Sequence, residues 1–371
     1  MPELGNLRLG YIDWLRGFAC LGMFQVHCYD SWLDVASRKS SFYGWSRFAG
    51  TLPGPLFVFL AGVAVALVTD KMRRKGIAAN QIAAKTIRRG ADIFGLSLLF
   101  RVQEFLLGLP RAPWTDLLRV DVLNVIGISI MLMGLVCWLA RTRAASAILA
   151  AAVALAVALS TPPLWTTWRP HWLPWYLESY INGVHTYDAP QPGLFPIFPW
   201  SGFVFAGLAI GFVLQSDWPR ENPGKAISLL GGACGVGLLV FSLWFDARPV
   251  QLYAVYDYWH TSPNFFLARV GVLLILTFAA YAWCRWGLGE VGFSPLVQMG
   301  QTSLLVYWVH IEFVYGRFSI LTKRSQGIAG ATRGLLVICA AMVLLSIART
   351  RLKGHRAEIL AWLRRALRTA T

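Results

Sequence analysis

The stretch that decides the fold is YIDWLRGFACLGMFQVHCYDSW, residues 11–32. It is mostly apolar and long enough to cross a bilayer as one α-helix. It nevertheless carries Asp13 and Arg16 near one end, and His27 and Asp30 near the other. Ionisable side chains at membrane depth are costly, so they indicate a functional site. Arg16 and His27 are about three helical turns apart, and Asp13 falls close to the same face. The helix therefore predicts one polar stripe that links both sides of a membrane.

The composition of the whole chain is that of a polytopic membrane protein. Its 371 residues are 56% apolar and 14% charged, with a mean hydropathy of +0.53, whereas soluble domains are about 25% charged. We predict an all-α bundle of about ten transmembrane helices in a single domain, residues 1–348, because the apolar residues come in blocks of about 20. The expected spans are residues 11–30, 51–69, 90–108, 118–139, 144–160, 195–215, 226–245, 264–283, 295–314 and 332–348.

The basic residues predict the orientation of the chain. The net charge of +16 could suggest a nucleic-acid partner, but Lys and Arg lie mostly in short loops between spans, where the positive-inside rule places them. We therefore exclude nucleic acid. Residues 71–89 form the most basic loop, so we expect this loop and both termini to be cytoplasmic and His27 to lie near the outer face. We expect residues 349–371, which are rich in arginine, to form a basic, amphipathic cytoplasmic tail. The expected location is the inner (plasma) membrane of the cell, with multiple passes.

Two further spans carry charges at membrane depth. The third contains Arg101 and Glu104, and the fourth contains Asp121 and Asn124. Each pair, like the one in the first span, can be a structural pair at i,i+3 spacing. The guanidinium of Arg101, like that of Arg16, also suits a phosphate or diphosphate of a bound co-substrate. Charges on three separate helices together indicate a polar cavity inside the bundle.

Two histidines near the outer face indicate chemistry there. His27 lies one turn from Asp30, which could orient the imidazole and raise its basicity, as a general base requires. His310 lies one turn from Tyr307 in the ninth span. We expect His27 and Asp30 to be catalytic, and His310, Tyr307 and Trp200 to line the polar cavity. We expect no metal, because no Glu-x-x-His or His-x-x-x-His spacing occurs. The six cysteines fall in or beside apolar spans, which indicates packing residues and not a disulfide framework.

Four segments resemble the transmembrane acyltransferases related to heparan-alpha-glucosaminide N-acetyltransferase. They are RLGYIDWLRGFACLGMFQVHCYDSW (8–32), LPGPLFVFLAGVAVAL (52–67), LLRVDVLNVIG (117–127) and FPIFPWSGFVFAGLAIG (195–211). The resemblance implies transfer of an acyl group, usually acetyl, from cytoplasmic acyl-CoA to a hydroxyl or amine of a sugar or glycan on the outer side. It places catalysis at the polar tip of the first helix, where this chain has His27. The lysosomal enzyme has asparagine at that position and a catalytic histidine in the following loop, whereas residues 31–50 here contain none.

The resemblance also implies the partners. The expected co-substrate is acetyl-CoA or another acyl-CoA, and the expected partners are the lipid bilayer and the sugar or glycan acceptor. A homodimer is left open, as is the choice between direct transfer and an acyl-histidine intermediate. A multi-pass transporter or exporter of a polar or anionic solute would explain the intramembrane charges equally well. That alternative predicts inverted repeats and helices broken at mid-membrane, whereas the prolines here cluster at helix ends and in loops.

Overall fold

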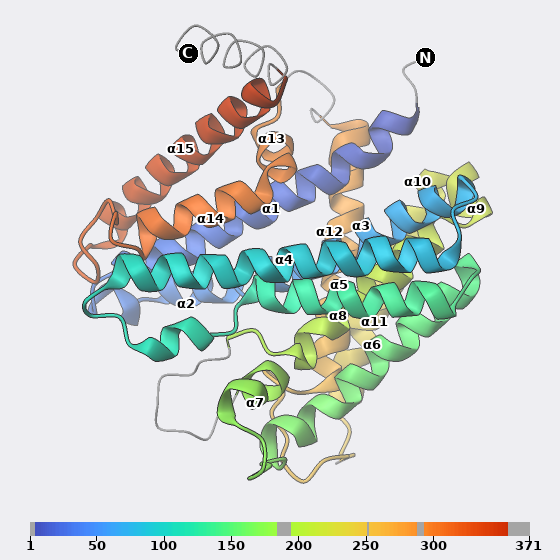
Figure 1. The fold of residues 1–371 in the computed structure, drawn as a ribbon, viewed down its shortest axis with the longest axis horizontal. Coiled ribbons are helices and arrows are strands. Elements are labelled where there is room, and N and C mark those ends of the chain that lie inside the picture. Colours follow the sequence, from blue (N-terminus) through green and yellow to red (C-terminus); the bar gives the residue numbers. More distant parts are fainter. Residues whose placement is uncertain (1–3, 184–193, 251, 288–292, 355–371) are drawn as a thin grey trace, which may run out of the picture. The chain divides into compact units, whose positions relative to one another are not determined.

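The computed structural model describes residues 4–183, 194–250, 252–287 and 293–354 (Figure 1). Within these ranges the regular structure is helical, and the strand-like pairing is one isolated bridge between Leu33 and Gln326. The all-α fold predicted from the sequence is thus confirmed. The helices form two compact units, one made of Met1–Pro53 with Leu288–Thr371 and one made of Gly54–Gly287.

The first unit combines the two ends of the chain. Its helices are α1 (Leu4–Trp32), α2 (Ser41–Ala49), α13 (Pro295–Gln301), α14 (Ser303–Val314) and α15 (Ile328–Gly354), with a 3₁₀ turn at Ser37–Lys39. The central helix α1 contacts α13, α14 and α15, and Figure 1 shows it in blue beside α14 and α15 in orange and red. One face of α1 is fully buried at four-residue spacing, at Cys20, Phe24, Cys28 and Trp32. An apolar stripe with this period is what packs a helix against its neighbours.

Two glycines let α1 and α13 approach closely. A Cβ atom on Gly17 would collide with the backbone oxygen of Leu296, and a Cβ atom on Gly300 would collide with the backbone oxygen of Asp13. Small residues at helix interfaces allow such backbone contact within a membrane. The half of α1 that carries Asp13 is therefore seated directly on α13.

The expected ninth span, residues 295–314, is not one continuous helix. The helix breaks at Thr302, whose backbone has φ −119° and ψ 21°. The Thr302 side chain contacts the Ser346 hydroxyl of α15 at 2.6 Å and donates to the Gln298 carbonyl at 3.4 Å. Hydroxyl contacts of this kind compete with the helix ladder and bend it. The sequence predicted one span here, and the structure divides it into α13 and α14 at a residue whose hydroxyl contacts a partner far along the chain.

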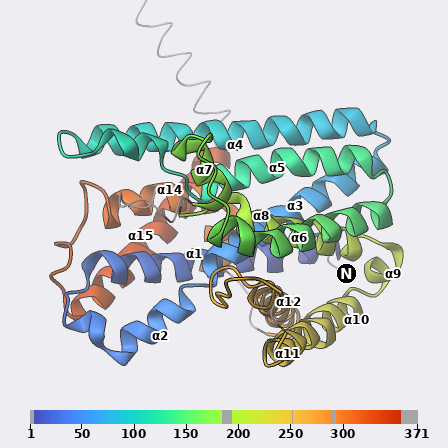
Figure 2. The same ribbon diagram turned by 90° about the horizontal axis from the view of Figure 1, so that it is seen from below.

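The second unit contains the central part of the chain. Its helices are α3 (Pro53–Arg74, all but its first residue), α4 (Ala79–Gly108), α5 (Val122–Leu139), α6 (Arg143–Thr166), α7 (Trp175–Asn182), α8 (Ile197–Leu214), α9 (Asp217–Glu221), α10 (Pro223–Ser228), α11 (Gly235–Asp246) and α12 (Pro263–Trp286), with a 3₁₀ segment at Trp114–Leu118 and a π segment at Leu229–Cys234. Sequential helices pair, α4 with α5 and α11 with α12, while α6 packs on α8. Figures 1 and 2 both show α4 and α5 side by side.

In the part of the chain that the structure describes, seven segments are long and apolar enough to cross a bilayer, which makes this a multi-pass membrane protein. They are Ser41–Arg74, Val122–Leu139, Arg143–Thr166, Ile197–Leu214, Pro223–Asp246, Pro263–Trp286 and Ile328–Lys353. The other three expected spans correspond to α1 and α4, which carry charges, and to the broken pair α13 and α14. The total of ten, the single domain and the cytoplasmic termini stay predictions. The helix α15 continues past the expected span into the tail, and residues 355–371 of that tail lie outside the described residues.

Two segments expected to be loops contain short helices. In the first, α2 begins at Ser41, and the preceding Ser40 caps it by accepting a hydrogen bond from the Tyr43 backbone N–H. In the second, α7 follows Pro174. A serine cap and a proline just before the first turn are both ordinary helix starts, but each helix is too short for its apolar pattern to predict it.

Candidate active site

Helices α1 and α14 bring the two predicted histidines into contact. The Nδ1 atom of His27 lies 2.9 Å from the Nε2 atom of His310. The two rings are parallel, with 5.2 Å between their centroids. His310 is fully buried, whereas His27 is half-buried. Of the two imidazoles, His27 is therefore the more exposed.

The hydrogen bonds of the pair assign its protons. The Nδ1 atom of His310 lies 2.9 Å from the Val306 carbonyl oxygen, which can only accept a hydrogen bond. His310 therefore carries its proton on Nδ1, and its Nε2 atom accepts from the Nδ1–H of His27. This leaves Nε2 of His27 unprotonated, with no hydrogen-bond partner among the described residues. A neutral imidazole with a free nitrogen is the form that a general base or a nucleophile requires.

Aromatic rings surround the histidine pair. Phe24 packs on His310 with 4.8 Å between ring centroids, and Tyr307 contacts the same ring edge-on at 5.9 Å. Tyr315 meets His27 edge-on at 5.3 Å. The sequence predicted Tyr307 beside His310 from the one-turn spacing. The rings fix both imidazole planes, so the hydrogen bond between them is geometrically defined.

Asp30 does not contact the ring that it was expected to orient. Its Oδ2 atom accepts a hydrogen bond from the Tyr315 hydroxyl at 2.8 Å, and Arg38 lies 3.7 Å from its Oδ1 atom. The Arg38 guanidinium also donates to the backbone oxygen of Asp30. The carboxylate is half-exposed, so it meets partners at the surface while His27 points inward to His310. Through its hydrogen bonds, Asp30 is linked to His27 by way of Tyr315, whose hydroxyl donates to the carboxylate and whose ring packs on the imidazole.

The end of α1 is anchored to the end of α14 and to the segment that follows it. The Ser31 hydroxyl donates to the Val314 carbonyl at 2.7 Å, and Trp32 Nε1 donates to the Ser319 hydroxyl at 3.0 Å. The backbone N–H of Gln326 donates to the Trp32 carbonyl at 2.9 Å. These bonds set the register of α1 against α14 and so set the distance between the histidines. Beyond the helix, the Ser37 backbone N–H donates to Asp34 and holds the pKa of that carboxyl below its ordinary value.

The other end of α1 carries the second predicted cluster of this unit. Arg16 Nη1 lies 3.3 Å from Asp13 Oδ1, and Gln301 of α13 also hydrogen-bonds the Asp13 carboxyl. Both charged side chains are part-buried. The rise of an α-helix places Arg16 about 16 Å from His27 along the axis. The polar stripe predicted for this helix is therefore present, with an ion pair at one end and the histidine pair at the other.

The charged residues of α4 and α5 form a cluster within the second unit. Arg101 Nη2 lies 3.1 Å from Asp121 and 3.2 Å from Glu104, and both Arg101 and Asp121 are buried. Asp121 caps α5 in a capping box with Asn124, whose side chain donates to the Tyr180 hydroxyl at 3.2 Å. Burial raises the pKa of Tyr180 above its ordinary value. The contact between Arg101 and Asp121 joins two helices, and it accounts for the charge of both residues as a structural pair.

A family model for the catalytic domain of heparan-alpha-glucosaminide N-acetyltransferase matches residues 8–233, more than half of the chain. The chain belongs to this family. The relationship predicted from the four sequence segments is thereby confirmed, and it makes the chain a member of a family of membrane acetyltransferases. A comparison with curated proteins found no match.

The family match covers only some of the candidate site residues. It contains α1 with His27, and it contains the Arg101 cluster. It ends before α13 and α14, so His310 and Tyr315 come from a part of the chain beyond the matched residues. The partner that fixes the His27 proton is thus supplied by the C-terminal helices.

Trp200 packs among aromatic side chains in this acetyltransferase-family chain, and its place in a polar cavity stays a prediction. Its ring packs on Phe195 with 4.6 Å between centroids and on Phe203 at 6.3 Å. It also lies against Gly54, where a Cβ atom would be 2.9 Å from the indole. Its surroundings are apolar, which is the usual environment of a packed aromatic side chain.

Metal binding finds no support in the described part of the chain, which contains no group of three or more His, Cys, Asp or Glu side chains arranged to hold an ion. The six cysteines are free, and four of them are buried, as expected for packing residues. The sequence did not point to Tyr315 or Arg38. Tyr315 follows α14 and Arg38 lies in a short 3₁₀ turn, so no helical periodicity marks either residue.

Proposed function

We propose that the chain moves an acyl group, acetyl in the first instance, from cytoplasmic acyl-CoA to a hydroxyl or amine of a sugar or glycan on the outer side of the inner (plasma) membrane. The observation that carries the proposal is the hydrogen-bonded pair of His27 and His310, 2.9 Å apart. It lies at the tip of the helix that matches the acetyltransferase family. The free Nε2 atom of His27 is the reactive atom.

The pair suits acyl transfer by general base catalysis. His27 Nε2 takes the proton from the acceptor as its oxygen or nitrogen attacks the thioester carbonyl carbon. The carbon–sulfur bond then breaks, and the proton passes to the departing thiolate of CoA. During the step the imidazolium of His27 keeps its Nδ1–H on His310, which holds the ring in place. A covalent route uses the same atom, with His27 Nε2 attacking the thioester and the acceptor displacing the acyl group from it.

The donor is expected to enter from the other end of α1. Arg16 uses one nitrogen on Asp13, which leaves further donors of its guanidinium for a phosphate of CoA. The basic residues between 71 and 89, expected on the cytoplasmic side, would raise the local concentration of the anionic donor by long-range attraction. The pantetheine arm would then run along the polar stripe toward His27. Arg101 already holds two carboxylates, so its role as a phosphate ligand stays a prediction and the donor site rests on Arg16.

The direct test is His27→Ala in the purified protein, with radiolabelled acetyl-CoA and a panel of amino sugars and hydroxyl sugars. General base catalysis is worth roughly 10²- to 10⁴-fold, so we expect transfer to fall by at least about 100-fold. His171→Ala is the matched control, because His171 is an exposed histidine in the second unit. Undiminished transfer by the His27 variant to any acceptor would overturn the assignment.

A transporter is the second candidate, and one observation favours it. The interruption of α13 and α14 at Thr302 is the kind of helix break that transporters place at a substrate site. Thermal stabilisation of the purified protein by acetyl-CoA, with hydrolysis or transfer of the acetyl group, supports the enzyme. Solute flux in proteoliposomes with no acetyl transfer supports the transporter.

A further inference from the structure

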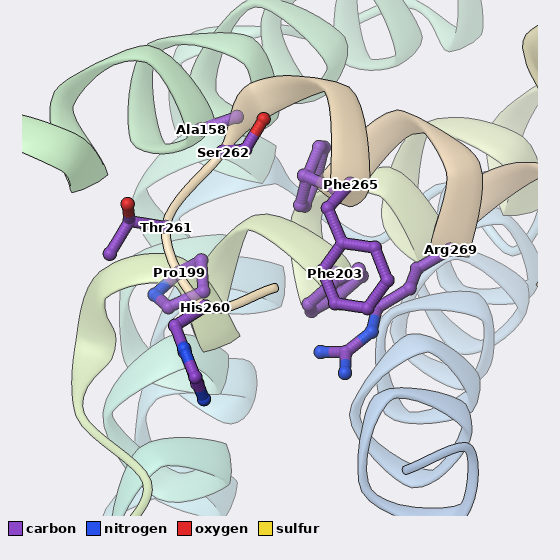
Figure 3. A pocket seen from close by; sticks show the side chains of 9 residues that line it. Ala158, Pro199, Phe203, His260, Thr261, Ser262, Phe265 and Arg269 are labelled. Carbon is purple, nitrogen blue, oxygen red and sulfur yellow. The ribbon is translucent and has the colours of Figure 1, made fainter. Parts of the chain in front are cut away.

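The second unit contains a pocket beside the N-terminal end of α12 (Figure 3). Its empty volume is ≈ 240 Å³. Residues from α6, α8 and α12, and from the segment just before α12, line it: Ala158, Pro199, Phe203, His260, Thr261, Ser262, Phe265, Phe266 and Arg269. Neither the family match, which ends at residue 233, nor the proposed acyl transfer involves these α12 residues.

Arg269 lines this pocket and forms no ion pair with any described residue. Its guanidinium stacks on the ring of Phe265, 4.1 Å from the centroid. Its Nε atom is buried, and the side chain has no hydrogen-bond or ion-pair partner among the described residues. Stacking uses the face of a guanidinium and leaves its N–H edge free to bind an anion. An arginine this deep in an apolar helix calls for an anionic partner.

The nearby carboxylates are engaged by other groups. Asp257 lies 2.8 Å from the Nδ1 atom of His260. Asp246 accepts hydrogen bonds from the Tyr256 hydroxyl and, at 3.2 Å, from the Asn264 side chain. Neither acid forms an ion pair with Arg269, so the free edge of the guanidinium stays available to a ligand.

The start of α12 adds a second attraction for an anion. Ser262 caps this 24-residue helix and accepts a hydrogen bond from the Asn264 backbone N–H at 3.1 Å. Thr261 and Ser262 are both buried and line the pocket. The Thr261 hydroxyl donates to the Asp257 carbonyl and the Ser262 hydroxyl to the Tyr256 hydroxyl, each at 3.3 Å, so the attraction comes from the helix end itself. The N-terminal end of a helix carries a partial positive charge and favours negative ligands.

We propose that this pocket binds an oxyanion, the phosphate or carboxylate group of a larger ligand, between Arg269 and the N-terminal end of α12. The pocket is open to solvent, so it takes only the charged group and leaves the rest of the ligand outside. Two sources supply such a group, a phospholipid headgroup and a soluble sugar acid or sugar phosphate. The proposal holds whether or not His27 is catalytic.

The test is a thermal-shift titration of the purified full chain with sodium phosphate, at constant ionic strength against sodium chloride. We expect phosphate to stabilise the wild-type protein and Arg269→Gln to weaken this binding by at least about tenfold, because charge-assisted hydrogen bonds are lost. Arg248→Gln is the matched control: Arg248 also stacks on an aromatic ring, that of Trp244, but it is exposed. No phosphate-specific shift in the wild-type protein, or an equal shift in the Arg269 variant, overturns the proposal.

Two additions complete the design. If Arg269→Gln does not fold, Arg269→Lys keeps the charge but not the two-pronged geometry, and it should weaken phosphate binding severalfold; unchanged affinity in that variant also counts against the site. Phosphatidylglycerol in detergent micelles and soluble glucuronate then distinguish the sources. Arg269-dependent binding of the lipid assigns a headgroup, and Arg269-dependent binding of glucuronate assigns a soluble acid. If no probe depends on Arg269, the proposal is wrong.

Discussion

His27 and His310 share a hydrogen bond of 2.9 Å between Nδ1 of the first ring and Nε2 of the second. Because the Val306 carbonyl fixes the proton of His310, the same bond fixes the proton of His27. A fully buried imidazole thus selects the tautomer of a half-buried one. In this arrangement His310 would position His27 without itself touching a substrate.

The first prediction concerns His310 as a positioning residue. His310→Leu removes the acceptor, so His27 can place its proton on either nitrogen and rotate. We expect kcat/KM for acetyl transfer to fall roughly 10- to 100-fold, by analogy with the loss when the partner that orients a metal-ligating histidine is removed, and the pH profile of kcat to shift. His310→Gln keeps an acceptor oxygen and should retain more activity than the leucine variant at equal stability. A merely structural role predicts parallel losses of activity and melting temperature and no change in the pH profile.

The second prediction separates the two roles open to Asp30. The structure links Asp30 to His27 through Tyr315, whose hydroxyl donates to the carboxylate at 2.8 Å. Asp30→Asn keeps an oxygen acceptor and should leave kcat within a few-fold of wild type. Tyr315→Ala removes the ring from His27 and should lower kcat more than Tyr315→Phe, which loses only a hydrogen bond worth about 1 kcal/mol. Steady-state acetyl transfer measures all three. A collapse of activity in Asp30→Asn alone would restore the direct pairing with His27.

The sequence predicts the fold class because bilayer-length apolar blocks are a local property. It fails where a structure depends on distant residues. At the break, the Thr302 hydroxyl contacts Ser346 of α15, 44 residues along the chain, and a window around residue 302 does not contain that partner. The sequence does not predict the short helices α2 and α7 for another reason. Each is shorter than the window in which helical periodicity is detectable.

In the candidate site, too, the sequence predicts the local features but not the contacts between distant residues. His27 and His310 are visible in the sequence because each is a polar residue within an apolar helix. Their contact spans 283 residues of chain, and no local spacing encodes it. Asp30 was assigned to His27 by its i,i+3 spacing, but spacing alone cannot say whether a surface partner such as Arg38 attracts the carboxylate more strongly.

The third prediction tests the close seating of α1 on α13. Gly300→Ala places a methyl group on the backbone oxygen of Asp13, and overpacking of this kind costs about 1–3 kcal/mol. Gly10→Ala is the matched control on α1, because a Cβ atom there meets nothing within 4 Å. It should be neutral or stabilising by up to about 1 kcal/mol, the helix propensity of alanine over glycine. Thermal unfolding in detergent measures both, and equal melting temperatures would contradict the backbone contact.

The last prediction concerns the ion pairs at the ends of α3 and α6. Asp70 is 1% exposed and lies 2.6 Å from Arg143 Nε and 3.0 Å from Arg74 Nε. Asp217, whose side chain is 84% exposed, lies 2.8 Å from the same Arg143 guanidinium. The two aspartates lie at similar distances from Arg143, but one is buried and the other is exposed. Comparing them therefore shows how much burial, at nearly equal distance, contributes to the strength of an ion pair.

Asp70→Asn leaves two cations without their buried partner. Removing one member of a buried pair costs about 3–5 kcal/mol, and the partial exposure of both arginines places the expected loss near the lower end of that range. Asp217→Asn should change stability by less than about 1 kcal/mol, as exposed ion pairs do. Unfolding in detergent at low and high salt measures both variants. Salt should reduce the small effect at Asp217 and leave most of the effect at Asp70, because buried charges are screened less. Equal losses in the two variants would show that distance, and not burial, decides the strength of this cluster.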